Sequence, residues 1–271
     1  MAEFSMRFLH PCINMGELIQ PTKCLNVKLA GSPDRYPSAQ AMAKPIPPVE
    51  KLKAVLFDID GTLAKSDPLH LLAFREMLQE VGFQGGVPID EEFFQKHISG
   101  RHNHDIGVDL FPSWDEERRA KFLDDKESLF RSLAAKQLKP VAGLYRMSNW
   151  VKEHGLHRAA VTNAPRENAE LMISALGLND FFELLVIGNE CERPKPFPDP
   201  YLKALKLFGI SSDEAFAFED SPSGLKAAVG AGLSVVGLTT GNPGPILLDA
   251  GASFLIENYD DPALWDALHD S

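Results

Sequence analysis

Short apolar runs alternate with longer segments of helical period from residue 51 to the end of the chain. We expect strands at 54–58, 159–162, 184–188, 215–219, 234–238 and 253–256, because these runs are rich in β-branched or aromatic residues and are bounded by turn formers. Most are apolar throughout, as is typical of strands covered on both faces. Helices are expected at 144–154, 168–176 and 201–208, with Gly155, Gly177 and Gly209 just past their ends. The pattern predicts an α/β fold with a doubly wound parallel sheet.

The first two expected strands are separated by about a hundred residues of helical pattern, far more than a βα crossover needs. We interpret residues 67–138 as an inserted helical cap, and residues 51–66 with 139–271 as the α/β core. Asp67 is expected to cap a helix that ends before Gly82, and Ser113 with Glu116 predicts a capping box ahead of a second long helix. The cap is expected over the carboxyl ends of the strands, where open α/β sheets bind ligands.

The first fifty residues contain seven prolines and no lasting apolar period, which predicts a poorly ordered N-terminal extension. Its five basic and four acidic residues are not typical of an Arg- and Ser-rich, acid-poor transit peptide. We therefore expect a cytoplasmic location, with import into a plastid as the alternative. No secretory signal and no bilayer-spanning apolar stretch is expected.

The charge balance and the cysteines narrow the class of partner. The chain has 27 basic and 38 acidic residues, a formal net charge of −11, and no block of Lys and Arg, which argues against nucleic acid and anionic membranes as partners. Three irregularly spaced cysteines fit neither a disulfide framework nor a zinc site. We expect a monomer that acts on a small molecule.

Two pairs of carboxylates follow expected strands. Asp58 and Asp60 come at the end of the first strand, and Glu219 and Asp220 at the end of the fourth. Two like charges about 6 Å apart repel by roughly 3 kcal/mol at an effective dielectric constant near 20. A bound divalent cation would remove this repulsion, and hard oxygen ligands with room for water and phosphate favour Mg²⁺ over Zn²⁺ or Ca²⁺. The alternative is that Asp58 and Asp60 form only a solvated turn.

Four motifs in chain order identify a resemblance. The segment Asp58-Ile-Asp-Gly-Thr resembles the first motif of the haloacid dehalogenase-like superfamily of phosphotransferases. Thr162, Lys195 and the Glu219-Asp220 pair resemble its second, third and fourth motifs. The resemblance covers about residues 53–266, including the type of cap. Within the superfamily the chain is similar to plant sugar-phosphate phosphatases and to β-phosphoglucomutases.

The resemblance implies a role for each acidic residue. Asp58 would be the nucleophile that forms an aspartyl phosphate, and Asp60 the general acid and then the general base. Asp58, Asp60 through its backbone carbonyl, and Asp220 would hold Mg²⁺, with Glu219 as a further ligand or beside the ligands.

Further residues are expected around the substrate. By resemblance Lys195 supplies positive charge to the phosphoryl oxygens, and Thr162 binds the phosphate. Asn163 is either a turn former or a phosphate contact, and His70 either a cap residue that contacts the general acid and the substrate or a half-buried polar residue. Arg101 is a candidate for binding a sugar hydroxyl or phosphate. The histidines near it, at 97, 102 and 104, lack supporting ligands for a metal site.

These features predict a Mg²⁺-dependent phosphatase of small sugar phosphates that forms an aspartyl phosphate. The alternatives are a phosphomutase of the β-phosphoglucomutase type, a glycerol phosphate phosphatase, and a binding protein without catalysis. Ser99 and Asn103 stand where the mutases carry basic cap residues, which favours water as the final acceptor. The intact motif residues argue against a non-catalytic protein, and dehalogenase chemistry needs neither Asp60 nor a metal.

Overall fold

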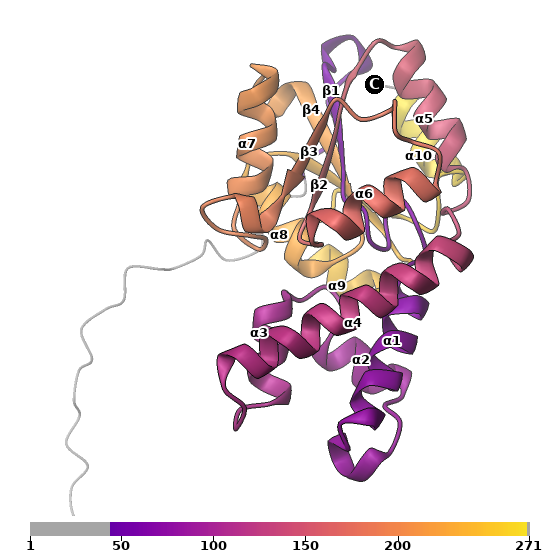
Figure 1. Cartoon of the computed structure of the whole chain (residues 1–271). Helices are drawn as coiled ribbons and strands as arrows, with labels where there is room; N and C mark the ends of the chain where they lie inside the picture. The colour runs from indigo at the N-terminus through magenta and orange to yellow at the C-terminus, as the bar shows by residue number, and fades with distance from the viewer. Residues whose placement is uncertain (1–43, 270–271) are drawn as a thin grey trace, which may run out of the picture. The chain divides into compact units, whose positions relative to one another are not determined.

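A single six-stranded sheet organises the computed structural model, which describes residues 44–269. The strand order is β3-β2-β1-β4-β5-β6, and every pair of neighbours is parallel (Figure 1). The strands are β1 (Ala54–Phe57), β2 (His157–Thr162), β3 (Leu184–Ile187), β4 (Ala215–Glu219), β5 (Ser234–Leu238) and β6 (Phe254–Ile256). The predicted α/β class with a parallel sheet is confirmed.

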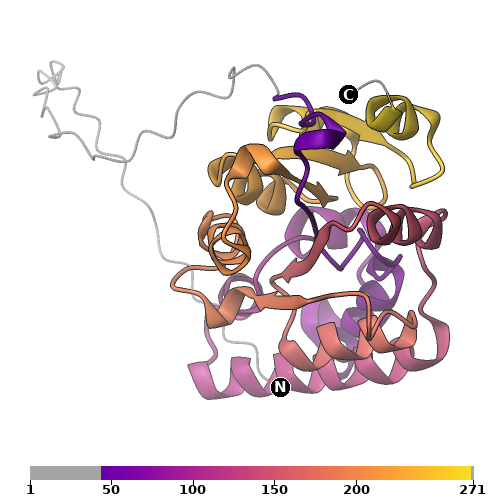
Figure 2. The same ribbon diagram turned by 90° about the horizontal axis from the view of Figure 1, so that it is seen from above.

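Helices cover both faces of this sheet (Figures 1 and 2). One face packs against α5 (Leu144–Glu153), α6 (Arg166–Ala175) and α10 (Pro262–His269), and the other against α7 (Asp199–Phe208), α8 (Pro222–Gly230) and α9 (Gly244–Asp249). Strand β1 serves both faces, because Val55 and Phe57 lie in the first cluster while Ala54 and Leu56 lie in the second. Its burial on both sides explains its continuous apolar sequence.

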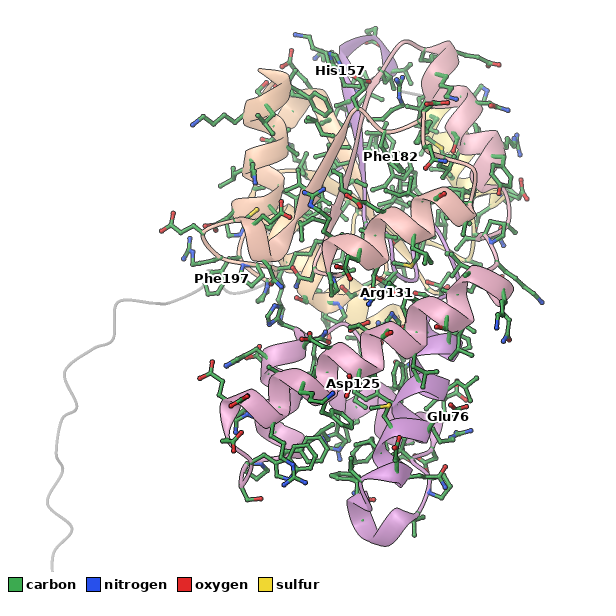
Figure 3. All side chains as sticks on the ribbon, viewed as in Figure 1. Glu76, Asp125, Arg131, His157, Phe182 and Phe197 are labelled. Carbon is green, nitrogen blue, oxygen red and sulfur yellow. The ribbon has the colours of Figure 1, made fainter. Side chains whose placement is uncertain are left out.

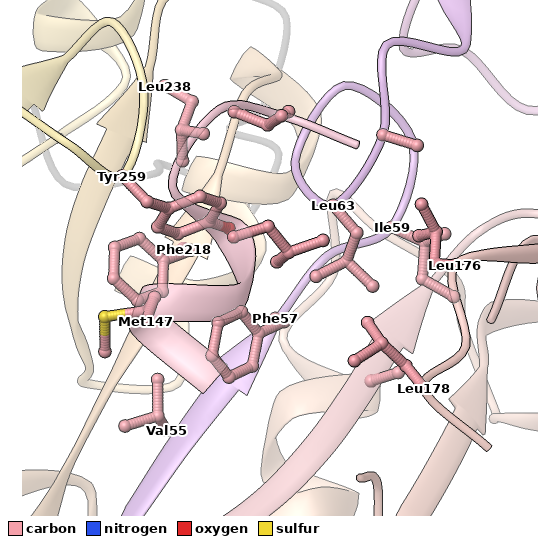
Figure 4. Packing of buried hydrophobic residues seen from close by; sticks show 14 of the residues in the cluster. Val55, Phe57, Ile59, Leu63, Met147, Leu176, Leu178, Phe218, Leu238 and Tyr259 are labelled. Carbon is pink, nitrogen blue, oxygen red and sulfur yellow. The ribbon is translucent and has the colours of Figure 1, made fainter. Parts of the chain in front are cut away.

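Aromatic packing holds β1 and β4 together beneath the ends of the strands. The rings of Phe57 and Phe218 stack with centroids 5.3 Å apart, and Phe218 meets Tyr259 edge to face at 5.0 Å (Figure 4). All three side chains are fully buried, and burying one such side chain contributes about 1.5–3 kcal/mol. This packing therefore fixes the positions of the two strands that carry the acidic residues.

Four helices between β1 and β2 form a separate layer with its own core (Figure 1). These are α1 (Asp67–Glu80), α2 (Glu91–His97), α3 (Asn103–Leu110) and α4 (Glu116–Gln137). Phe74, Phe94, Phe111 and Phe122 are buried in this core, and α4 also packs against α6 of the α/β part. We call this layer, residues 67–137, the cap.

The ends of the helices differ in part from the sequence prediction. Asp67 is the first residue of α1 rather than its N-cap, because its carboxylate accepts hydrogen bonds from other parts of the cap. The N-cap of α4 is Asp115, whose side chain accepts from the amide of Arg118 at 2.8 Å, so the expected capping box of Ser113 with Glu116 is wrong. The extended backbone of Asp115 places its carboxylate over the first turn.

Glycines end three core helices as expected. Gly155, Gly177 and Gly209 have φ of 63°, 68° and 68°, and the last caps α7 in the left-handed conformation. The remaining regular elements are four short 3₁₀ helices, η1 (Val49–Lys51), η2 (Phe83–Gly86), η3 (Gly188–Glu190) and η4 (Ser212–Glu214).

The expected N-terminal extension lies mostly outside the described residues, at 1–43. Residues 44–50, which the sequence assigned to it, pack on the core instead. The hydroxyl of Ser234 donates to the carbonyl of Pro45 at 2.5 Å, and Ile46 is buried. This short segment thus packs on residues far away in the chain, which the pattern of its own sequence could not indicate. Among the helices of residues 44–269, none combines the length and hydropathy that a bilayer-spanning segment needs.

Candidate active site

The register of the parallel strands brings the acidic residues together. Phe57 of β1 pairs with Phe218 of β4, so Asp58 and Glu219 follow at the same edge of the sheet. The amide of Asp58 donates to the carbonyl of Phe218 at 3.0 Å, which extends this pairing into the site. Asp58, Glu219 and Asp220 are all buried there.

Lys195 lies at the centre of this cluster. Its Nζ donates to Asp58 Oδ1 at 2.7 Å, to Glu219 Oε1 at 2.6 Å and to the carbonyl of Val161 at 2.7 Å. The ammonium thus has three oxygen partners, which matches its three N–H donors. The resemblance implied that Lys195 supplies positive charge to the phosphoryl oxygens, and the structure brings its ammonium between two carboxylates.

Glu219 is held from behind by a residue that the sequence analysis missed. The hydroxyl of Tyr201 on α7 donates to Glu219 Oε1 at 2.5 Å, and both side chains are fully buried. A Cβ added at Gly224 would lie 1.9 Å from Glu219 Oε2. Gly224 is therefore required by the close approach of this carboxylate. The sequence feature that could have identified Tyr201 is its position on the buried side of an amphipathic helix.

The acidic cluster fits a divalent cation. Ligand oxygens of Asp58, Glu219 and Asp220 all lie within 4.8 Å of one another. Lys195 is bonded to Asp58 and Glu219, whereas within residues 44–269 no hydrogen bond reaches the carboxylate of Asp220. Carboxylate oxygens are hard ligands, and those of Asp220 accept no hydrogen bond within the described residues, so the cluster is suited to a divalent cation. The expected contribution of Asp60 through its backbone carbonyl stays a prediction.

Burial and repulsion act together on the pKa values of this cluster. Burial raises the pKa of Asp58 to about 8, opposed by the charge of Lys195 and supported by Glu219. Burial also raises the pKa of Asp220 well above its usual value, and the charge of Asp58 adds to the effect. Both directions express chiefly the burial of the carboxylates, to which neighbouring negative charges add, and a bound cation would oppose them.

Asp60 occupies a different environment from Asp58. Its Oδ1 lies 3.1 Å from Nε2 of His70, and the His70 ring stacks on Phe130 with centroids 3.7 Å apart. Although burial opposes ionisation, the hydrogen bond and charge of His70 lower the pKa of Asp60. The structure thus brings together the expected acid–base residue and the expected cap histidine.

The two expected phosphate-binding residues at the end of β2, Thr162 and Asn163, make local contacts. The hydroxyl of Thr162 accepts from the amide of Ala164 at 3.0 Å. Asn163 accepts from the amide of Lys195 at 3.0 Å and donates to its carbonyl at 2.9 Å, so it positions the lysine loop. The Lys195–Pro196 peptide bond in this loop is cis. A phosphate contact of Asn163 stays a prediction.

The expected cap residues mostly contact other protein groups. Arg101 donates to Asp109 Oδ2 at 2.6 Å and to the carbonyl of His97 at 2.9 Å, while Ser99 donates to Asp67 Oδ2 at 3.1 Å. The nearby histidines have separate partners, for example Asn189 for His102. In the described part of the chain, the one cluster with metal-ligand geometry is the acidic one at the strand ends.

A buried ion pair on α4 was also missed from sequence. Lys126 Nζ lies 2.5 Å from Glu127 Oε1, and the side chains are 1% and 6% exposed. Burial raises the pKa of a carboxyl group, but the charges of Lys126 and His70 and the hydrogen bonds from Lys126 and Asn103 together outweigh it and lower the pKa of Glu127 to about 2. Both residues stand three or four positions from Leu123 and Phe130 on the buried face. The pair could have been identified from sequence because both charged residues fall within the apolar stripe of the helix.

A cavity of about 110 Å³ joins the cap to these strand ends. Asp58, Asp60, Lys195 and Asp220 line its floor. His70, Arg101, Lys126 and Glu127 line it from the cap. The cavity therefore places the carboxylates of Asp58 and Asp60 and the ammonium of Lys195 around one space.

Comparison with known proteins agrees with this geometry. A sequence model described as haloacid dehalogenase-like hydrolase matches residues 55–238, which include every strand-end residue named above. The chain belongs to the haloacid dehalogenase-like hydrolase family. The phosphorylated carbohydrates phosphatase of Thermotoga maritima is 28% identical over 212 residues, which are 76% of this chain and 94% of that protein. Protein CbbY of Rhodobacter capsulatus is 31% identical over 199 residues, or 69% of this chain and 85% of that one.

Solved structures extend the family likeness to the fold. A haloacid dehalogenase hydrolase of Entamoeba histolytica, family IA, variant 3, superposes with a TM-score of 0.71 at 27% identity, covering 80% of this chain and 98% of that one. The haloacid dehalogenase-like fold is thus shared over nearly the whole length of that protein.

Proposed function

We propose that this protein is a Mg²⁺-dependent phosphatase that hydrolyses small sugar phosphates. The observation that carries the proposal is the contact of Lys195 with both Asp58 and Glu219 in a buried cavity beside Asp60. Its similarity to a phosphatase of phosphorylated carbohydrates supports the substrate class. Asp58, Asp220 and the backbone of Asp60 would hold the cation, which supplies positive charge to the phosphoryl oxygens.

The residues of the chain then account for two chemical steps. A carboxylate oxygen of Asp58 attacks the phosphorus, and the ester P–O bond breaks as Asp60 donates a proton to the leaving oxygen. The products are the free alcohol and an aspartyl phosphate. Asp60 next takes a proton from water, whose oxygen attacks the phosphorus. The bond between the phosphorus and the Asp58 oxygen breaks, which releases inorganic phosphate and restores the Asp58 carboxylate. Lys195 balances the charge of the phosphoryl oxygens in both steps.

The contacts of the cap support water as the acceptor rather than a second sugar phosphate. A mutase must retain a bisphosphate, which requires cap cations that are free to bind it. Arg101 is bonded to Asp109, and Asn103 donates to Glu127 at 2.6 Å. Glycerol phosphate fits the same site chemistry and belongs in the substrate panel.

A phosphate-release screen over a panel of phosphomonoesters tests the proposal. We expect release from several sugar phosphates and no conversion of β-glucose 1-phosphate to glucose 6-phosphate when a bisphosphate is added. Isomer formation faster than phosphate release would establish the mutase instead. Absence of release from every ester would refute the phosphatase.

A further inference from the structure

The cap presents a pair of opposite charges to the cavity that contains Asp58. Lys126 and Glu127 both line it, and their charged atoms are 2.5 Å apart. The Lys126 ammonium also lies 4.4 Å from the centroid of the Phe74 ring, which fixes it against the apolar core of the cap. Charged residues this deeply buried are rare without a specific function or partner.

Glu127 is fixed by donors from three helices. Besides Lys126 on α4, Asn103 on α3 donates to its Oε1 at 2.6 Å, and Asn168 on α6 donates to its Oε2 at 2.6 Å. Asn168 in turn accepts from Arg131 at 2.9 Å. Figure 3 shows Arg131 on α4, where this helix faces α6. The carboxylate is therefore held in place and remains ionised.

Among residues 44–269, no cation that lines the cavity from the cap is unpaired. Lys126 is matched by Glu127, and Arg101 by Asp109. Asp67 adds a further carboxylate, bonded to Ser99. An anionic group on the part of a substrate that faces the cap would meet Glu127 in a cavity of about 110 Å³ with little water to screen it.

We propose that Glu127 is a specificity-determining residue: by neutralising Lys126 it makes the cap reject a second anionic group and accept a neutral, hydroxyl-bearing one. The inference rests on the phosphatase function proposed above and narrows its substrates to phosphomonoesters of neutral polyols and sugars. Lys126 contributes through N–H donors that Glu127 does not use, which can bind a hydroxyl oxygen.

Two substrates that differ in one group provide the test. Glycerol 3-phosphate and 3-phosphoglycerate share a phosphate ester and a hydroxyl, and differ by a hydroxymethyl group in place of a carboxylate. We expect the wild-type protein to prefer glycerol 3-phosphate in kcat/KM. Glu127→Gln should raise the ratio of kcat/KM for 3-phosphoglycerate to kcat/KM for glycerol 3-phosphate by about tenfold or more. The reason is that it removes one negative charge near the carboxylate of 3-phosphoglycerate.

The opposite change is made at the partner of Glu127. Lys126→Met leaves the carboxylate of Glu127 without its counter-charge, so the same ratio should fall below that of the wild type. In the double variant Lys126→Met with Glu127→Gln, the gain of Glu127→Gln should be largely lost, because the cation that attracts the carboxylate is gone. Glu117→Gln, an exposed position on α4, is the matched control and should leave the ratio unchanged.

The outcomes separate this inference from the proposed function. If the wild-type protein releases phosphate from neither of these substrates nor from any sugar phosphate, the phosphatase proposal fails. If it is a phosphatase that prefers 3-phosphoglycerate, the inference fails and the function stands. If folded Glu127→Gln and Lys126→Met both keep the wild-type ratio of kcat/KM values, the pair has only a structural role and the inference fails. Should Glu127→Gln not fold, the wild-type preference and Lys126→Met still decide the matter.

Discussion

The ammonium of Lys195 lies 2.7 Å from Oδ1 of Asp58, although 137 residues separate the two in the chain. A second carboxylate, Glu219, lies 2.6 Å from the same Nζ. Lys195 therefore joins the loop after β3 to the ends of β1 and β4, and it keeps two buried carboxylates together.

Removing this ammonium is expected to destabilise the protein as well as to abolish activity. Lys195→Met leaves Asp58 and Glu219 buried without their shared partner, and breaking a buried pair in this way costs about 3–5 kcal/mol. Urea unfolding monitored by circular dichroism measures the loss. Lys121→Met, at a lysine whose side chain is 74% exposed, is the control and should leave the urea midpoint nearly unchanged. Equal midpoints for the two variants would contradict the structural role of Lys195.

Asp58, the proposed nucleophile, can be replaced with little change in shape. Asp58→Asn should abolish phosphate release, because an amide cannot form the acyl phosphate, while the circular dichroism spectrum stays that of the wild type. Release is measured by a phosphate assay on the best substrate of the panel. A folded variant with a tenth of the wild-type rate would mean that another residue is the nucleophile.

The proposed metal requirement is testable by chelation. EDTA should stop phosphate release and added Mg²⁺ should restore it, because Asp220 lies in a cluster of carboxylates that Lys195 does not fully neutralise. Asp220→Ala should raise the Mg²⁺ concentration needed for half-maximal activity, without changing the order of preferred sugars. Full activity after exhaustive chelation would remove the metal from the mechanism.

A close backbone approach makes Gly61 sensitive to the smallest side chain. Gly61 has φ of +69°, and a Cβ there would lie 1.9 Å from Asp220 Oδ2. Gly61→Ala should therefore displace Asp220 and abolish activity. Gly82 has nearly the same φ, +70°, but nothing within 4 Å of the added Cβ, so Gly82→Ala should cost only about 1 kcal/mol and retain activity. Comparing the two variants in the phosphate assay separates backbone strain from loss of site geometry.

The buried pair on α4 predicts a pH-dependent stability. Burial raises the pKa of Glu127, but the charges of Lys126 and His70 and the hydrogen bonds to the carboxylate together lower it from 4.5 to about 2. Its stabilisation is therefore fully present above pH 4.5 and lost as the pH falls through about 2. Near pH 6, Glu127→Gln should reduce the free energy of unfolding by about 3 kcal/mol, and near pH 3 by about half as much. Urea titrations at both pH values measure the difference, and a pH-independent difference would contradict an ionised Glu127.

The strands and the acidic residues at their ends could be predicted from sequence because their signals are local. A strand buried on both faces must be apolar throughout, and Asp58 and Asp60 directly follow such a run. The hundred-residue insertion with helical period likewise predicted the cap. The ends of its helices were less well predicted, because Asp67 makes a tertiary contact with Ser99 instead of a cap.

The partners of these residues were decided only by the tertiary structure. The parallel register of β1 and β4 sets Asp58 beside Glu219, and the packing of α7 brings Tyr201 behind them. Lys126 and Glu127 are adjacent charges in the sequence, where a solvated helix face is the usual expectation. Folding buries them together, because Glu127 finds hydrogen-bond donors on two other helices and the two charges compensate one another. Local periodicity records which residues are apolar, whereas the pairing of buried charges depends on helices that meet only in three dimensions.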